Sequence, residues 1–268
     1  MVLMIKFKKS KNSGRWSNLE KVYKVHPEAE EFYFPGNEIG ILVSHGFTGS
    51  TQSMRYLGTQ IAKSGFTVYG PRLTGHGTEP EDMEQATYKD WISDVEKGLE
   101  RLQQTCSKIF IIGLSMGGTL SLYLAQKYVD IAGIIPINAA VDIPNLKATY
   151  ENMKNSGTRF IEGIGSDIKM AGVAELAYSK TPVKSLGDLI TLMDQVRGNL
   201  YKVTVPTLII SSIVDHVVPP ENSKQIYHSI STEDKSIVFL KNSYHVATLD
   251  NDKDLIAKEC SRFISNRV

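Results

Sequence analysis

The chain has 268 residues, which is long enough for one large α/β domain, and no linker-like change in composition divides it in two. Its 41% hydrophobic and 22% charged residues are ordinary for a globular protein, and its net charge of +1 gives no reason to expect nucleic acid or a strongly anionic partner. The two cysteines, Cys106 and Cys260, lack the spacing of a metal site and are expected to be reduced thiols in a cytoplasmic protein.

The N-terminal residues 1–28 are rich in Lys and Arg and predict a loosely held extension before a domain at 29–268. Attraction of this extension to a membrane surface is the less favoured alternative. A short apolar run precedes the basic residues, which is the reverse of a secretory signal, and no window reaches the ~18 apolar residues of a membrane span. Secretion and stable membrane insertion are therefore not expected.

Apolar runs and helical stretches alternate along the rest of the chain. Residues 88–104 predict a helix, because Trp91, Val95, Leu99 and Leu102 recur at helical spacing. The runs are nearly continuous, as is typical of parallel strands covered on both faces. The order predicts an α/β protein with a doubly wound, mostly parallel sheet. The predicted strands are 39–46, 66–71, 108–113, 132–138, 206–212 and 235–242.

A long segment at about 141–200 interrupts this alternation. It is mostly helical in pattern, punctuated by glycine and without a clear central strand, and it is too long for an ordinary connection. We expect a small helical insertion over the carboxyl ends of the strands, where open α/β folds bind their ligands.

The stretch GLSMG at 113–117 places Ser115 between a predicted strand and a predicted helix. An abrupt strand-to-helix turn strains its central residue and requires very small neighbours, which Gly113 and Gly117 supply. The pattern favours a nucleophilic serine, and the alternative is a glycine-rich structural turn.

A serine nucleophile requires a base and an orienting acid, which in this kind of fold follow it in the order Asp, His. Asp215 comes just after the run at 206–212, and His245 follows the last strand. Each residue alone could be a turn or loop residue, but their joint order favours a catalytic triad. The backbone amides of Phe47, in a glycine-flanked turn, and of Met116, after the serine, are expected to form the oxyanion hole.

The remaining histidines have less demanding interpretations. His45 is predicted to be a structural hydrogen-bonding residue of the loop, and His76 is interpreted in the same way, with substrate contact as the alternative. His216 is assigned to the surface.

The stretches SHGFTGS, PRLTGHG, GLSMGGTLSLYLA, SSIVDHVVPPENS and NSYHVATLD, in this order, resemble the α/β-hydrolase fold over about residues 28–268. More narrowly, the chain resembles the bacterial monoacylglycerol lipases of the Bacillus type and their carboxylesterase relatives. The resemblance implies that Ser115, Asp215 and His245 are catalytic and that Phe47 and Met116 supply the oxyanion amides. It also implies a small helical cap inserted after the sixth strand of the sheet.

In that family the cap receives the acyl chain and recognises the glycerol hydroxyls. The resemblance suggests that Glu175 accepts hydrogen bonds from glycerol, although a solvated helix carboxylate is an alternative. Ile143, Ile161 and Ile164 are candidates for the acyl path, although cap packing would also explain them.

The expected function is hydrolysis of monoacylglycerols to fatty acid and glycerol through an acyl-enzyme. The alternatives are a general short-to-medium-chain carboxylesterase and, from another class, a non-hydrolytic binding protein that keeps the fold. No metal and no cofactor is expected. The expected partner is a small lipid ester, with transient contact to lipid surfaces as a further possibility, and the oligomeric state is left open.

Overall fold

The computed structural model describes residues 21–268, so most of the expected N-terminal extension lies outside the described residues. Within the described part, the segment before the domain contacts the loop at 77–79. Lys21 Nζ pairs with Glu79, and the His26 amide donates a 2.8 Å hydrogen bond to the Gly77 carbonyl oxygen. The 3-10 helix η1 (Pro27–Ala29) follows.

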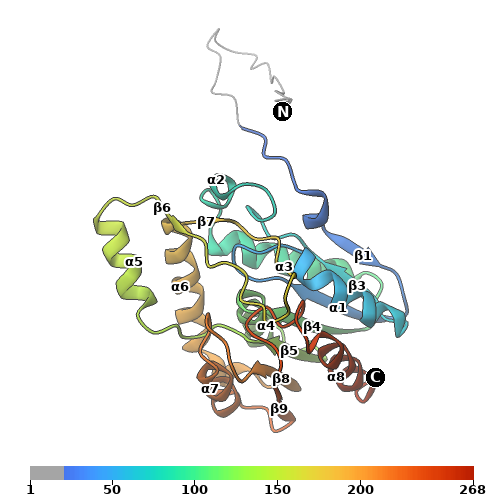
Figure 1. Cartoon of the computed structure of the whole chain (residues 1–268). Helices are drawn as coiled ribbons and strands as arrows, with labels where there is room; N and C mark the ends of the chain where they lie inside the picture. The colour runs from blue at the N-terminus through green and yellow to red at the C-terminus, as the bar shows by residue number, and fades with distance from the viewer. Residues whose placement is uncertain (1–20) are drawn as a thin grey trace, which may run out of the picture.

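A seven-stranded sheet crosses the molecule in the order β1-β3-β2-β4-β5-β8-β9 (Figure 1). All pairs are parallel except β1 with β3, which confirms the doubly wound, mostly parallel sheet. Each of the six predicted strands is present. The missed strand, β1, has only three residues, too few to show a periodic pattern. The bounds are β1 (Phe32–Phe34), β2 (Ile39–Ser44), β3 (Thr67–Gly70), β4 (Lys108–Leu114), β5 (Gly133–Ile137), β8 (Thr207–Ser212) and β9 (Lys235–Leu240).

Helices cover both faces of the sheet. On one face, α1 (Gln52–Lys63) and α8 (Lys253–Ser265) pack against each other and against strand side chains such as Ile112. The other face carries α3 (Tyr88–Gln103), α4 (Met116–Lys127), α6 (Val183–Arg197) and α7 (Glu221–Ser229), and the short helix α2 (Pro80–Met83) precedes α3. Two apolar cores result, one on each side of the sheet.

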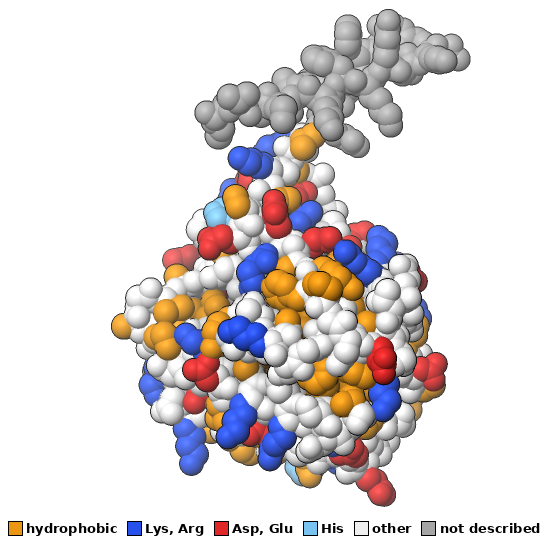
Figure 2. Space-filling view, turned by 90° about the vertical axis from the view of Figure 1, so that its right-hand side faces the viewer, with side chains coloured by type: hydrophobic (Ala, Val, Ile, Leu, Met, Phe, Trp, Pro, Cys, Tyr) orange, Lys and Arg blue, Asp and Glu red, His pale blue; other side chains and the backbone are white. Residues whose placement is uncertain are grey.

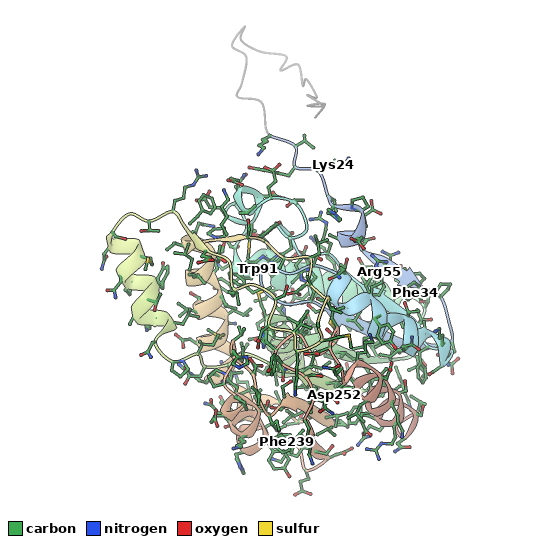
Figure 3. The ribbon with its side chains drawn as sticks, in the orientation of Figure 1. Lys24, Phe34, Arg55, Trp91, Phe239 and Asp252 are labelled. Carbon is green, nitrogen blue, oxygen red and sulfur yellow. The ribbon has the colours of Figure 1, made fainter. Side chains whose placement is uncertain are left out.

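The helix α3 buries the apolar face that its sequence predicts. The four residues predicted to form its apolar face are all buried, and one of them, Trp91, is fully enclosed (Figure 3). Thr87 and Asp90 form a capping box at its start, which satisfies two backbone donors that the helix leaves unpaired.

The insertion at 141–200 differs from the predicted helical cap in two respects. It contains α5 (Leu146–Asn155) and α6, but also a two-stranded antiparallel sheet of β6 (Phe160–Glu162) and β7 (Lys180–Pro182), and residues 163–179 have no regular structure. It follows β5, the fifth strand among the described residues, so the predicted position after a sixth strand is wrong. α5 and α6 lie side by side at one edge of the molecule (Figure 1).

Charged side chains are distributed over the surface. On the face in Figure 2, Lys and Arg side chains are interspersed with Asp and Glu, and hydrophobic side chains lie between them. None of the helices within residues 21–268 combines the length and the apolar character needed to span a bilayer.

Candidate functional site

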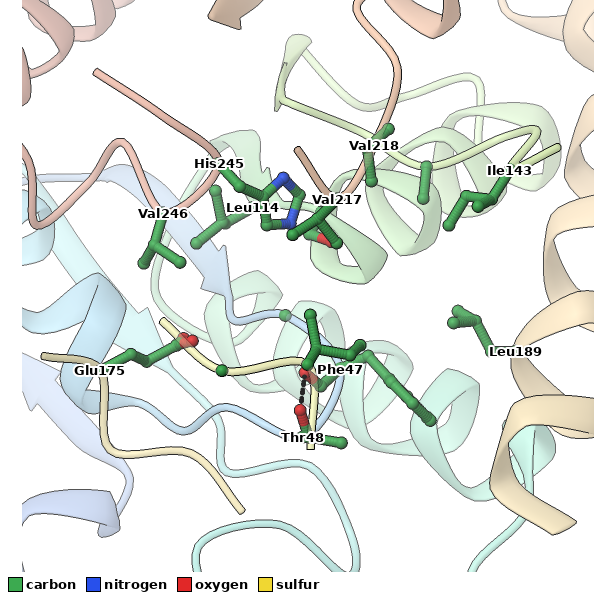
Figure 4. A pocket seen from close by; sticks show the side chains of 15 residues that line it. Phe47, Thr48, Leu114, Ile143, Glu175, Leu189, Val217, Val218, His245 and Val246 are labelled. Atoms are coloured by element: carbon green, nitrogen blue, oxygen red, sulfur yellow. Dashed lines mark hydrogen bonds between the residues drawn. The ribbon is translucent and has the colours of Figure 1, made fainter. Parts of the chain in front are cut away.

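The carboxyl ends of β2, β4, β5 and β8 meet at one edge of the sheet, beneath the insertion. A small cavity of about 40 Å³ lies there, lined among others by Ser115, His245, Phe47 and Glu175 (Figure 4). It adjoins a groove of about 470 Å³ whose walls come mostly from the insertion. The structure therefore brings the main predicted site residues to one place, as expected for an open α/β sheet.

The predicted sharp turn is present at Ser115, between β4 and α4. Ser115 has a φ of +55°, a strained conformation for a residue with a side chain. A Cβ at position 113 would lie 2.0 Å from the Gly117 carbonyl oxygen, so the turn requires glycine at 113. The Ser115 amide donates to the Ile137 carbonyl oxygen at 2.9 Å, which anchors the turn to β5.

His245 and Asp215 form a buried pair beside this turn. The distance from His245 Nδ1 to Asp215 Oδ2 is 2.8 Å, and the two side chains are only 7% and 2% exposed. The other carboxylate oxygen, Asp215 Oδ1, accepts hydrogen bonds from the amides of Val217 and Val218 at 2.9 and 2.7 Å. These contacts fix the carboxylate and leave His245 Nε2 as the ring nitrogen available to a third group.

Ser115 and His245 line the same cavity, but within residues 21–268 no hydrogen bond joins the Ser115 hydroxyl to the His245 ring. Such contacts are often long in enzymes without substrate and shorten when substrate binds. The arrangement therefore places a hydroxyl near an oriented imidazole, as nucleophilic chemistry requires.

The amides of Phe47 and Met116 lie close to Ser115 in the chain fold. A Cβ at Gly46 would lie 3.4 Å from Ser115 Cβ, so the turn after β2 packs directly against the serine. The Phe47 amide donates to no acceptor in the described part of the chain. Met116 is the first residue of α4, so its own N–H has no acceptor within the helix. The Thr48 hydroxyl donates to the Phe47 carbonyl oxygen at 2.7 Å and holds the turn (Figure 4).

His45 is a structural hydrogen-bonding residue of this turn. Its Nε2 accepts from the Leu73 amide at 3.2 Å, so its Nδ1 carries the proton and donates to the Gly46 carbonyl oxygen at 2.9 Å. Desolvation by burial lowers the pKa of His45 to about 4. His45 is therefore neutral near pH 7. His76 packs edge-on against it, and burial also lowers its pKa well below the ordinary value.

Glu175 projects into the cavity from the irregular segment of the insertion (Figure 4). Desolvation by burial raises the pKa of its carboxyl group, and none of the described Lys or Arg side chains forms an ion pair with it. A Cβ at Gly49 would lie 2.4 Å from Glu175 Oε1, so the loop after β2 leaves just enough room for this carboxylate. A desolvated carboxylate facing a cavity can accept hydrogen bonds from a ligand.

The three isoleucines predicted for the acyl path have different positions. Ile143 and Ile164 line both the cavity and the groove. Ile161 is not among the lining residues. It lies in β6, paired with Thr181, and its side chain packs against the core. The structure therefore does not bring Ile161 to the site, because the predicted helical segment forms a strand there.

Two residues that hold the site together were missed from the sequence. Asn138, after β5, donates to the His245 carbonyl oxygen at 2.8 Å and accepts from the Ser212 amide at 2.7 Å. Its place directly after a buried strand was a signal that could have identified it. Asp167, in the insertion, accepts from the His245 amide at 3.1 Å, and no local sequence pattern indicates this contact.

His216, assigned to the surface, is largely exposed, but its side chain is held by Asp167. Its Nδ1 lies 2.8 Å from Asp167 Oδ1, and the residue lines the groove.

Comparison with known proteins identifies the relatives of this chain. The family described as serine aminopeptidase, S33, matches residues 38–252. The chain is 49% identical over 249 residues to the thermostable monoacylglycerol lipase of Bacillus sp. strain H-257, covering 92% of this chain and 98% of that protein. It is 31% identical over 234 residues to a carboxylesterase of Bacillus subtilis strain 168, covering 87% and 95% of the two chains.

A solved structure from work on the metagenome-derived lipolytic enzymes LipS and LipT agrees with the same grouping. It superposes with a TM-score of 0.88 at 48% identity, and the match covers 91% of this chain and 100% of that chain.

Proposed function

The chain is an ester hydrolase of the α/β-hydrolase family described as serine aminopeptidase, S33, and we propose that it hydrolyses monoacylglycerols to glycerol and fatty acid. The observation that carries this proposal is that the strained Ser115 lines one cavity together with His245, whose ring is held by the buried Asp215, and with Glu175, which has no ion-pair partner among the described residues.

In the first half of the reaction, His245 removes the proton from the Ser115 hydroxyl while Oγ attacks the ester carbonyl carbon. Asp215 keeps the proton of the ring on Nδ1 and stabilises the imidazolium that forms. The amides of Phe47 and Met116 donate to the oxygen that becomes negative. Collapse breaks the bond to the leaving oxygen, which takes the proton from His245 and departs as glycerol.

The second half returns the enzyme to its starting state. His245 takes a proton from water, whose oxygen attacks the acyl carbon on Ser115. Collapse breaks the bond to Ser115 Oγ, which recovers its proton from His245, and the fatty acid leaves. One water is consumed for each ester cleaved.

The two sides of the cavity differ in chemistry, which suggests how the substrate is oriented. Glu175 lies on one side of the cavity, and Ile143 and Leu189 lie on the other, with His245 and Phe47 between them (Figure 4). We assign the alcohol portion to the Glu175 side, where the carboxylate accepts hydrogen bonds from the free glycerol hydroxyls. The acyl chain then enters the groove beside Ile143 and Ile164.

Transient contact with lipid aggregates is part of the proposal. Ile164 lines the groove and is 44% exposed, so it presents apolar surface at the entrance. Replacement by serine is expected to lower the rate on micellar monoacylglycerol more than on the same ester below its micellar concentration. If the substitution lowers the rate equally on micellar and on non-micellar substrate, Ile164 does not contact lipid aggregates.

A general carboxylesterase is the second candidate, since the Bacillus subtilis relative has that name. It would use the same chemistry with little selection for the alcohol. The experiment that separates the two measures initial rates on 1-monolauroylglycerol, methyl laurate and dilauroylglycerol, with wild type and Ser115→Ala. Strong preference for the monoglyceride and an inactive alanine variant would support the proposal. Equal rates on monoglyceride and methyl ester would favour the carboxylesterase.

A further inference from the structure

The irregular segment of the insertion is hydrogen-bonded to the loop that carries His245. Asp167 Oδ2 accepts from the His245 amide at 3.1 Å, and the Asp167 carbonyl oxygen accepts from the Val246 amide at 3.1 Å. The backbone of the predicted base is therefore held on two consecutive amides by one residue of the insertion.

The same carboxylate also reaches the loop that carries Asp215. Asp167 Oδ2 accepts from the His216 amide at 3.0 Å, and Oδ1 lies 2.8 Å from His216 Nδ1. One side chain thus joins three segments: the insertion, the loop after β8 and the loop after β9.

Burial and charge suit Asp167 to this role. Its side chain is 14% exposed. Burial alone would raise the pKa of Asp167, but hydrogen bonds from the His216 amide, the His216 ring and the His245 amide lower it, so the group is ionised near neutral pH. An ionised carboxylate is a stronger acceptor for backbone amides than a neutral group.

A second carboxylate fixes the neighbouring residues. Asp250 is fully buried and accepts from the amides of Lys169, Met170 and Tyr244 at 2.7, 2.9 and 2.9 Å. The segment is therefore attached to the His245 loop at Asp167 and again at residues 169–170, which limits how far Asp167 can move away from His245.

We propose that Asp167 is a positioning residue for His245, which holds the backbone of the base and the Asp215 loop in their reactive arrangement. This inference rests on the proposed roles of Ser115, His245 and Asp215. Asp215 controls the rotation of the imidazole ring, whereas Asp167 controls the place from which the ring projects. Because Asp167 belongs to the insertion, the wall of the acyl groove and the base are held as one unit.

The test compares Asp167→Ala, Asp167→Asn and Asp167→Ser with Asp234→Ala as the matched control. Asp234 is exposed and pairs with Arg267. Alanine removes every side-chain acceptor at 167, whereas the single oxygen of asparagine can still accept from both the His216 and His245 amides. Serine is also too short to reach both amides, but it keeps a polar group at this position. If the alanine variant does not fold, the serine variant still tests the proposal.

We expect Asp167→Ala and Asp167→Ser to lower kcat by about 10- to 100-fold, since small displacements of reacting groups have effects of this size. KM should stay within about two-fold, and asparagine should restore most of kcat. A kcat close to wild type in folded Asp167→Ala or Asp167→Ser would overturn the proposal. So would a change confined to KM, or a failure of asparagine to restore kcat.

The rate at which a fluorophosphonate labels Ser115 is measured on the same variants. It reports activation of the serine by His245 and requires no choice of ester. If wild type is labelled but does not cleave monolauroylglycerol, the proposed substrate fails while the comparison at position 167 can still be interpreted. If labelling of Asp167→Ala equals that of wild type, the positioning role fails by itself.

Discussion

Gly117 packs directly against the end of β2, because a Cβ at position 117 would lie 2.2 Å from the Ser44 carbonyl oxygen. This contact brings the first turn of α4, which follows Ser115, against the loop that carries Phe47. The backbone at Gly117 and the backbone at Ser44 both belong to buried elements of the core, so neither segment can move aside at low cost. The close approach therefore sets the relative position of the nucleophile turn and the predicted oxyanion turn.

Gly117→Ala is expected to abolish most activity and to lower the free energy of unfolding by about 1–3 kcal/mol, as overpacking does in a dense core. Thermal unfolding and the rate on monolauroylglycerol measure the two effects. Gly198→Ala is the control: it has φ −65° and its Cβ would lie 3.4 Å from the nearest atom. There we expect no loss of either quantity. Equal behaviour of the two variants would contradict the packing argument.

Local patterns are sufficient to predict the parts of this fold that local forces determine. The six long strands and α3 follow from periodic burial of apolar side chains, which a sequence displays directly. The turn at Ser115 is predictable because the backbone approach requires glycine at 113 and 117. Asp215 and His245 are predictable because parallel strands bring their following loops to one edge.

Features that depend on contacts between distant segments cannot be predicted from local sequence patterns. β6 and β7 have three residues each and pair across 17 residues without regular structure, so no local period distinguishes them from helix or loop. The misplacement of Ile161 follows from this error. Asp167 contacts His245 across 78 positions, and an aspartate in an irregular segment carries no signal of its partner.

Asp215→Asn tests the predicted orienting acid. The carboxylate accepts from two amides through Oδ1 and from the His245 ring through Oδ2. Asparagine can accept on one side only, so its NH₂ group either opposes the amides or forces His245 into the tautomer that leaves Nε2 protonated. We expect kcat to fall about 10⁴-fold with little change in folding.

The control for that experiment is Asp194→Asn, which changes an exposed carboxylate paired with Arg197. It should leave kcat unaltered. A fall of less than ten-fold in Asp215→Asn would show that His245 is not oriented by this residue.

Glu175→Gln tests recognition of the alcohol. If the carboxylate accepts hydrogen bonds from glycerol, its loss should lower kcat/KM for monolauroylglycerol by about 10-fold and leave methyl laurate almost unchanged. The ratio of the two kcat/KM values is the measurement. A parallel fall on both esters would instead assign Glu175 to the general structure of the cavity.

The same substitution has a predicted effect on stability. Burial raises the pKa of Glu175 above its ordinary value of 4.5, so the folded state holds this proton more tightly than the unfolded state. Folding stability therefore falls as pH rises above 4.5 through the raised pKa. Glu175→Gln should be more stable than wild type at pH 8, and the two should converge near pH 4. Denaturant unfolding at both pH values tests this, and a constant difference would contradict it.

Burial of His45 should lower the folding stability as pH decreases, which is the opposite of the Glu175 effect. Burial lowers its pKa to about 4 in the folded protein, against 6.5 in its ordinary state, so the unfolded chain binds the proton more readily between these values. Stability is therefore complete above pH 6.5 and falls as pH decreases. This side chain alone should account for about 2 kcal/mol of the loss between pH 7 and pH 5.

His45→Asn isolates that contribution, because asparagine does not titrate and can still donate and accept one hydrogen bond in the turn. The variant should be less stable than wild type at pH 7, since it loses buried packing, but its stability should fall less between pH 7 and pH 5. His76 packs against His45, and its lowered pKa depends partly on that neighbour, so the change in slope reports the two buried histidines together. His228→Asn, at an exposed position in α7, serves as the control and should keep the wild-type slope. If the stability of His45→Asn fell as steeply between pH 7 and pH 5 as that of wild type, His45 would have to bind protons in the folded state. The assignment of His45 as a buried, neutral residue that donates to the Gly46 carbonyl oxygen would then be wrong.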